Sequence, residues 1–218
     1  MNPACTNKEC SISATDPDTI GDGGENMVDS QFERKASDVL QRILLDLLLV
    51  TDGRTTDLLE LIMNEKVRVE VIRQEQITED ANIMGEFSGG PYYVRESVLI
   101  GEKSGFVVSH NIALIYSTHV PPALFENIAH RQQGIGKVMS SLGIRSLRDV
   151  ADSGFIIGED AIDLFKKPIK IRFPDLHHPI PYKRYFMYFG RKPGGIQMLE
   201  YYHPDLLAHR LQQEFKQE

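Results

Sequence analysis

The sequence predicts an α+β domain, and three observations lead to this prediction. Apolar residues first recur at helical spacing over about 30–48. Farther along, apolar and polar residues alternate with the two-residue period of β-strands. These segments are at about 67–74, 91–101, 106–117, 183–189 and 196–203. Finally, the short polar stretches EKSG and GRKPGG each join two successive strands, and EKSG is of the hairpin type.

The first predicted element is one long amphipathic helix. Ser30 and Glu33 match a capping box at its start. Its apolar side consists of Phe32, Ala36, Val39, Leu40, Ile43, Leu44, Leu47 and Leu48. The turn TDGR at 51–54 ends this helix, and Thr55 or Thr56 then caps a short helix that runs through Leu61.

Two further helices are predicted on the crossover that follows the first hairpin. PPALFENIAHR has prolines at its start, where proline is tolerated because the first backbone N–H groups have no helical partner. GIGKVMSSLG follows after Gly134. GIGK lacks the preceding glycine and the following Ser or Thr of a phosphate-binding loop, so we interpret it as the start of a helix.

Three charged residues, Arg73, Arg95 and Glu200, occupy apolar faces of the predicted strands. Arg95 shares a face with Tyr93, Ser97 and Leu99, whereas its neighbour Glu96 points to the other face. A buried charge costs several kcal/mol unless it is paired. The three residues therefore either form structural ion pairs, reach water along the sheet surface, or bind a ligand with carboxylate groups.

Composition limits the function classes. With 218 residues and 41% hydrophobic content, the chain can bury one sizeable core. A formal net charge of −7 argues against non-specific nucleic-acid binding, which needs a basic surface. No stretch is apolar enough to span a membrane and no signal peptide is recognisable, so we expect a soluble cytoplasmic protein. Cys5 and Cys10, the two cysteines, predict neither a disulfide framework nor a metal site.

The chain is expected to divide into a tail and a single domain. Residues 1–30 contain six acidic residues against Lys8, together with the stretch GDGG. Such a composition buries too little apolar surface to offset the entropy lost on ordering. We expect 1–30 to be a disordered or loosely attached acidic tail and 31–218 to be the folded domain.

Four ordered stretches resemble chorismate lyase and its chorismate-lyase-like relatives. They are RVEVIRQE (68–75), YYVRESVLIG (92–101), GIGKVM (134–139) and YFGRKPGGIQMLEYYHP (188–204), and the preceding LLLVTDGRTTDLLE (47–60) fits as well. The resemblance implies a single antiparallel sheet of about six strands, helices packed against it and an enclosed ligand cavity. It also implies a cofactor-independent carbon–oxygen lyase that converts chorismate to 4-hydroxybenzoate and pyruvate.

The same resemblance implies the roles of individual residues. Arg95 corresponds to the arginine that grips the ring carboxylate, and Glu200 to the carboxylate at the ring hydroxyl, so these two would be catalytic. Ile135 and Gly136 of GIG, together with Thr55, would line the substrate pocket, and Arg73 would assist binding. The chain departs from the family pattern at Asn111, where bacterial ubiquinone-pathway members carry a second arginine.

Alternative functions therefore stay open beside the lyase. Effector domains of some transcription regulators share this fold and bind carboxylated ligands without catalysis. These regulators carry a DNA-binding domain ahead of the fold, and residues 1–30 are too short for one, which favours the enzyme. A third alternative is a related enzyme that acts on another cyclic enolpyruvyl or aromatic acid. A small-molecule carboxylate is the expected partner in each case, no cofactor or metal is expected, and the oligomeric state is open.

Overall fold

The computed structural model describes residues 23–77, 91–130, 133–174 and 178–216, with side chains from residue 31 onward. The chain divides into two compact units, Met1–Asp38 and Val39–Glu218, and the description below concerns the second. The helices are α1 (Gly23–Val50), α2 (Thr55–Met63), α3 (Pro122–Ala129), α4 (Ile135–Ser141), α5 (Leu206–Phe215) and the short 3-10 helix η2 (Gly158–Asp160). The strands are β1 (Val67–Ile77), β2 (Tyr92–Gly101), β3 (Val107–Tyr116), β4 (Leu147–Ile156), β5 (Ile180–Tyr188) and β6 (Gly194–Tyr202).

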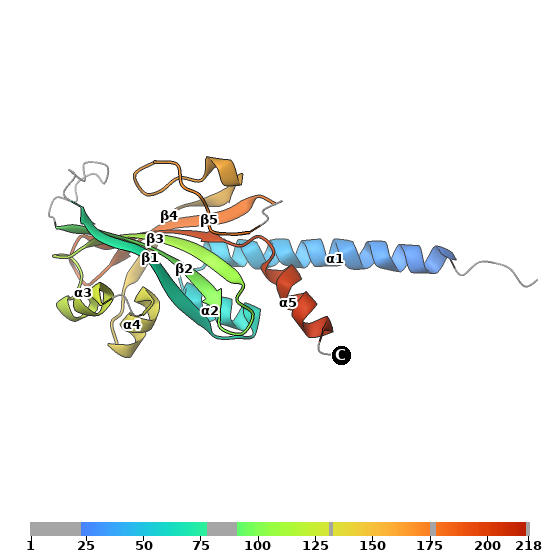
Figure 1. The fold of residues 1–218 in the computed structure, drawn as a ribbon, viewed down its shortest axis with the longest axis horizontal. Helices are drawn as coiled ribbons and strands as arrows, with labels where there is room; N and C mark the ends of the chain where they lie inside the picture. The colour runs from blue at the N-terminus through green and yellow to red at the C-terminus, as the bar shows by residue number, and fades with distance from the viewer. Residues whose placement is uncertain (1–22, 78–90, 131–132, 175–177, 217–218) are drawn as a thin grey trace, which may run out of the picture. The chain divides into compact units, whose positions relative to one another are not determined.

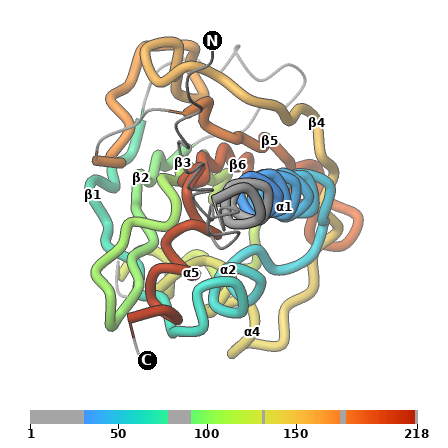
Figure 2. The backbone as a smooth tube through the Cα atoms, turned by 90° about the vertical axis from the view of Figure 1, so that its right-hand side faces the viewer, coloured from blue at the N-terminus to red at the C-terminus, as the bar shows by residue number. Residues whose placement is uncertain are grey.

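The six strands form one antiparallel sheet in the order β1-β2-β3-β6-β5-β4, which Figure 2 shows across the view. The predicted hairpin is present as β2–β3, and β5–β6 form a second hairpin. The predicted α+β class with a single antiparallel sheet of about six strands is confirmed. The register between β3 and β6 places Asn111 opposite Glu200 and joins the two hairpins at the centre of the sheet.

Helices cover one face of the sheet, which we call the helix face (Figure 1). Leu124 and Ile128 of α3 pack with Val138 of α4 against Ile115 and Ile196 of the sheet. The ends of α1 and α2 and the start of α5 pack near Leu99, Val108 and Tyr202. Because apolar surface leaves water at both clusters, burial stabilises the fold by about 25 cal/mol for each Å² removed.

The other face, which we call the loop face, is covered by the segment 157–174 between β4 and β5. Leu164, Ile171 and Phe173 from this segment pack on a row of buried strand residues. That row consists of Val94, Ile112, Leu114, Tyr116, Leu199 and Tyr201. Both faces of the central strands are therefore buried, which explains why β6 is buried along its whole length.

Two elements lie outside the predicted set, and each has a physical reason. Strand β4 has the sequence LRDVADSGFI, and half of its residues are exposed and none is buried, because it is an edge strand. Edge strands commonly carry charged residues, so the apolar alternation that identifies a strand is weak here. Helix α5 is short and buries Leu206 alone among its residues, which gives little helical periodicity.

Helix α1 differs from its prediction in both its start and its buried side. It begins at Gly23 rather than near Ser30. Leu45, Leu48 and Leu49 are its buried residues, and Leu48 alone comes from the predicted apolar side. Five members of that side are exposed, namely Phe32, Val39, Leu40, Ile43 and Leu47. The apolar residues of this helix outnumber what one side can bury, so spacing alone did not identify the packed side. None of the described helices is long and apolar enough to cross a membrane.

A β-bulge interrupts β1 between Val71 and Arg73. Ahead of it, Val69 pairs with Leu99 and Val71 with Ser97 on the helix face; beyond it, Gln74 pairs with Arg95 and Arg73 with Glu96. A bulge adds one residue to one strand, so the side chains that follow exchange faces. Strict alternation predicts Arg73 beside Val71 on the helix face, but the bulge puts Gln74 there instead.

Candidate functional site

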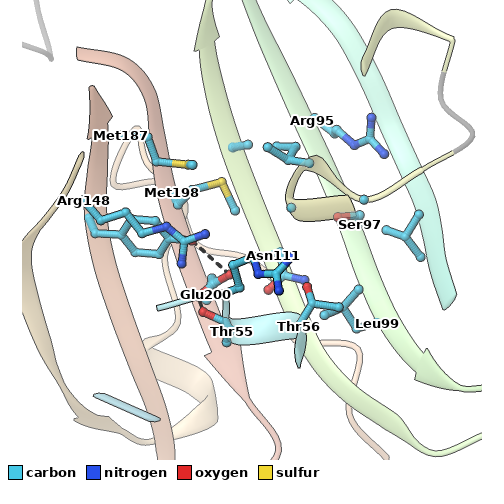
Figure 3. A pocket seen from close by; sticks show the side chains of 17 residues that line it. Thr55, Thr56, Arg95, Ser97, Leu99, Asn111, Arg148, Met187, Met198 and Glu200 are labelled. Atoms are coloured by element: carbon cyan, nitrogen blue, oxygen red, sulfur yellow. Dashed lines mark hydrogen bonds between the residues drawn. The ribbon is translucent and has the colours of Figure 1, made fainter. Parts of the chain in front are cut away.

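A pocket lies on the helix face, between the central strands and the starts of α2 and α4. Its inner cavity has a volume of about 60 Å³. Figure 3 shows the polar side chains around it: Arg95 from β2, Asn111 from β3, Glu200 from β6, Thr55 and Thr56 from α2, and Arg148 from β4. Apolar walls come from Leu99, Met187 and Met198, among others. A small cavity with few polar groups between apolar walls is typical of small-molecule sites.

Arg95 is the cation at one side of this pocket, and 2% of its surface is exposed. Its Nη1 donates to the side-chain oxygen of Gln74 at 3.2 Å and to the carbonyl of Ile128 at 3.0 Å. Its Nη2 donates to the carbonyl of Gln133 at 2.7 Å. These three neutral acceptors orient the guanidinium.

Glu200 lies at the centre of the helix face and is 6% exposed. Its carboxylate accepts hydrogen bonds from the hydroxyls of Tyr202 at 2.6 Å, Thr55 at 3.2 Å and Tyr185 at 3.2 Å. Burial, followed by the charge of Glu200, raises the pKa of both tyrosines, which therefore stay protonated donors. A carboxylate has about four lone-pair positions, so roughly one remains for a ligand.

Lys183 lies directly across from Glu200 in the sheet register. Its buried ammonium donates to the carbonyls of Leu48 at 2.9 Å and Thr51 at 3.0 Å, and so binds the end of α1. Burial lowers the pKa of Lys183, and the charge of Glu200 opposes this shift. Lys183 therefore offsets the buried charge of Glu200 while holding the segment that leads into α2.

Asn111 has a buried acceptor atom to which none of the described residues donates a hydrogen bond. Its residue is 6% exposed, and its Nδ2 donates to the hydroxyl of Ser109 at 3.0 Å. Its Oδ1 has no hydrogen-bond partner among the described residues. Because an unsatisfied buried acceptor costs about 1–3 kcal/mol, a donor supplied by a ligand would be favourable at this position.

The structure brings five of the six predicted site residues together. Arg95, Glu200, Thr55, Ile135 and Gly136 all line the pocket. Arg73 does not: its side chain is 42% exposed on the loop side of the sheet, where its Nε donates to Glu96 at 2.8 Å. The bulge in β1 is the reason, and Gln74 occupies the position beside Arg95.

Sequence reasoning missed Arg148 and Arg54. Arg148 lies on the unpredicted strand β4, and Arg54 belongs to the stretch TDGR, which signalled only a turn. Both line the inner cavity and also a wider groove outside it. Residues 51–54 carried a usable signal, because the stretch leads directly into α2. The prediction that Thr55 or Thr56 caps this helix is wrong: Arg54 is its N-cap residue, and no side chain makes a capping hydrogen bond.

The adjacent residues Ser109 and His110 point to opposite faces, as strand alternation predicts. Ser109 accepts from Asn111 on the helix face, whereas Nε2 of His110 lies 3.0 Å from Glu96 on the loop face. They therefore do not form a nucleophile and base pair. Within the described ranges, no three His, Cys, Asp or Glu side chains are grouped as metal ligands.

Comparisons with known proteins give likenesses to solved structures. No family model matches the chain, and no curated protein matches it. The effector domain of PhnF from Mycobacterium smegmatis is 19% identical, with 72% of this chain and 92% of that chain covered and a TM-score of 0.48. A GntR-family transcriptional regulator from Bacillus cereus is 13% identical, with 64% and 92% covered and a TM-score of 0.44. With identities below 25% and TM-scores below 0.5, these likenesses assign neither a family nor a function.

Proposed function

We propose that this domain binds a small organic anion carrying a hydroxyl or amino group, and that it acts as a binding module without catalysis. The observation that carries this proposal is the pair formed by Arg95 and Asn111 in one buried pocket. Arg95 brings a buried guanidinium that lines the pocket, and Asn111 brings an acceptor for which the described residues supply no donor. In a ligand with a carboxylate and a neighbouring hydroxyl or amine, the carboxylate can accept from Arg95 and the hydroxyl or amine can donate to Asn111.

The size of the inner cavity supports a small head group. The inner cavity has a volume of about 60 Å³. A cavity that accommodates benzene in another protein measures about 150 Å³. The inner cavity therefore fits a carboxylate and its α-substituent better than an aromatic ring.

The hydrogen bonds of Glu200 support binding over catalysis. A general acid or base must exchange its proton with the substrate. Glu200 instead accepts from three protein hydroxyls, which fix the carboxylate as an acceptor. Its remaining lone pair can accept from the hydroxyl or amine of a bound ligand.

Chorismate lyase activity is the second candidate, and one observation favours it. Arg95 and Glu200, the two residues that the resemblance makes catalytic, line the same pocket. Incubation of the purified chain with chorismate, followed by chromatography for 4-hydroxybenzoate and an assay for pyruvate, separates the two candidates. Under the binding proposal no product forms above the uncatalysed rate; product formation that is lost in Glu200→Gln would establish the enzyme instead.

Binding itself is tested by calorimetry with 2-hydroxybutyrate, glycerate and 4-hydroxybenzoate. Arg95→Lys keeps the charge but loses the planar fork, so we expect affinity for the binding acids to fall about 30-fold, or ~2 kcal/mol. Arg68→Gln, an exposed residue paired with Glu70, is the matched control and should leave affinity unchanged. Equal affinity in Arg95→Lys and in the unmodified chain would remove Arg95 from the site.

A further inference from the structure

The groove outside the inner cavity is rich in arginine. It has a volume of about 470 Å³, and Arg54, Arg145 and Arg148 line it together with a single carboxylate, Asp52. The whole chain carries a net charge of −7, so this groove is locally opposite in sign to the protein. A cationic concave surface concentrates anions even when the protein as a whole is acidic.

The groove and the inner cavity are continuous. Arg54, Gly136 and Arg148 line both of them. A ligand too large for the inner cavity can therefore extend past these three residues into the groove.

Arg148 lies where the inner cavity meets the groove, and no carboxylate is paired with it among the described residues. Its Nη1 donates to the carbonyl of Gly53, and its guanidinium carbon lies 5.5 Å from the ring centroid of Tyr185. Arg54 differs because it is already engaged by the carboxylate of Asp57 and the hydroxyl of Ser140. Arg148 has five N–H donors, and its contacts with the carbonyl of Gly53 and the hydroxyl of Tyr185 leave further donors that can bind an anion.

Figure 3 shows Arg95 and Arg148 at opposite sides of the pocket, with Asn111 and Glu200 between them. The pocket thus presents a cation at each side and hydrogen-bond acceptors in the middle. Arginine binds carboxylate and phosphate through two parallel hydrogen bonds, which is stronger than contact with a neutral group. Asn111 of β3 is neutral, and Arg148 supplies the second cation of the pocket from β4.

We propose that the ligand is a dianion, with one anionic group bound by Arg95, a second bound by Arg148, and a hydroxyl or amino group between them bound by Asn111 and Glu200. This inference rests on the proposed binding function and adds the second anionic group. The second group is a carboxylate or a phosphate, since Arg148 can bind either.

The experiment compares acids that differ only in the second anion. Malate is matched with 2-hydroxybutyrate, 2-hydroxyglutarate with 2-hydroxypentanoate, and 3-phosphoglycerate with glycerate. Affinities are measured by calorimetry on the full chain, on Arg148→Gln and on Arg148→Lys, with Arg68→Gln as the control. We expect at least one dianion to bind about tenfold or more tightly than its partner, because a charged hydrogen bond is lost with the second anion. The pair that shows this advantage identifies the second group as carboxylate or phosphate.

The variants then assign that advantage to Arg148. It should shrink below about twofold in Arg148→Gln, persist in part in Arg148→Lys and remain whole in Arg68→Gln. Equal affinities within every pair, or an advantage that survives in Arg148→Gln, would overturn the second-anion inference alone, provided that the monoanions bind. If none of the six acids binds, the proposed binding function fails together with it. A thermal unfolding scan of each variant shows that it is folded before the titration is interpreted.

Discussion

The two faces of the sheet use charged residues from the same strands in different ways. On the loop face, Glu96 contacts the Nε of Arg73 at 2.8 Å and the Nε2 of His110 at 3.0 Å, so its carboxylate has protein partners on both oxygens. On the helix face lie Arg95, which precedes Glu96 in β2, and Asn111, which follows His110 in β3. There the polar groups surround a cavity, and Asn111 keeps an unsatisfied acceptor.

This difference separates a structural cluster from a candidate site. A charge on a half-buried strand face gives the same sequence signal in both cases, because alternation reports burial and not the identity of the partner. On the loop face the charge of Glu96 is paired by the protein, although Nδ1 of His110 and Oε1 of Gln197 have no partner among the described residues. No ligand pocket with the polar groups of the helix face surrounds them in the described part of the chain, so these residues should matter for stability. The helix face leaves capacity for a ligand, so its residues should matter for binding. The next three predictions test this division.

The largest effect is expected from Glu96→Leu on the loop face. The substitution leaves the buried Nε2 of His110 without its partner and removes the carboxylate bound by Arg73. We expect the free energy of unfolding to fall by about 2–3 kcal/mol, measured by urea denaturation at pH 7. Affinity for the acids that bind the helix face should stay within about twofold. A large loss of affinity in a folded Glu96→Leu chain would show that the two faces do not act separately.

The pH dependence of stability should also arise on the loop face. Burial lowers the pKa of His203 from 6.5 to about 4, and burial likewise lowers the pKa of His110 although Glu96 opposes it. The unfolded chain therefore binds more protons than the folded chain between about pH 6.5 and pH 4. Stability should be full above about pH 6.5 and fall as the pH drops toward 4, by about 2 kcal/mol for His203.

Denaturation of the full chain at a series of pH values between 7 and 4.5 measures this loss. Nδ1 of His203 accepts from the backbone N–H of Asp205 at 3.1 Å, which requires the neutral ring. His203→Gln retains an acceptor without titrating, so its stability should depend less steeply on pH than that of the unmodified chain. Parallel curves for the two chains would assign the pH dependence to other groups.

The smallest effect is expected from Arg73→Gln. The Arg73 side chain is 42% exposed and its ion pairs are with Glu75 and Glu96 at the surface of the loop face. Exposed ion pairs contribute little, so stability should change by about 0.5 kcal/mol or less, in the same urea assay. Ligand affinity should not change, because Arg73 does not line the pocket. A tenfold loss of ligand affinity in Arg73→Gln would show that Arg73 belongs to the site and would contradict the observed pairing of Arg73 with Glu96 on the loop face.

The sequence predicted the central part of the fold well, because the central strands are buried on both faces and rich in β-branched and aromatic residues. It failed at the edges. Strand β4 carries Arg148, Asp149 and Asp152 among residues of which none is buried, so local composition did not show a strand. The predicted tail, residues 1–30, lies almost wholly outside the described residues and stays a prediction, as does the absence of nucleic-acid binding.

The candidate site was predictable where strand alternation continues without interruption. Arg95 and Glu200 lie within strands whose alternation is regular around them, and both are buried on the helix face as expected. Arg73 follows a bulge, whose position depends on pairing with β2 and is not visible in the residues themselves. Arg148 reaches the pocket from a strand far along the chain, so only the folded structure brings it near Glu200.

The bulge in β1 makes the register of this strand a determinant of what a ligand meets. With the bulge, the wall beside Arg95 is the neutral amide of Gln74, which accepts from Arg95. If the same residues paired without a bulge, Ile72 would lie opposite Glu96 and Arg73 opposite Arg95, so Arg73 would turn toward the pocket in place of Gln74. Two guanidinium groups would then face each other, and the wall would gain a full positive charge without any change in the residues that line the rest of the site. Ligand preference in this architecture can therefore change through the gain or loss of a bulge in an edge strand as well as through substitutions in the pocket.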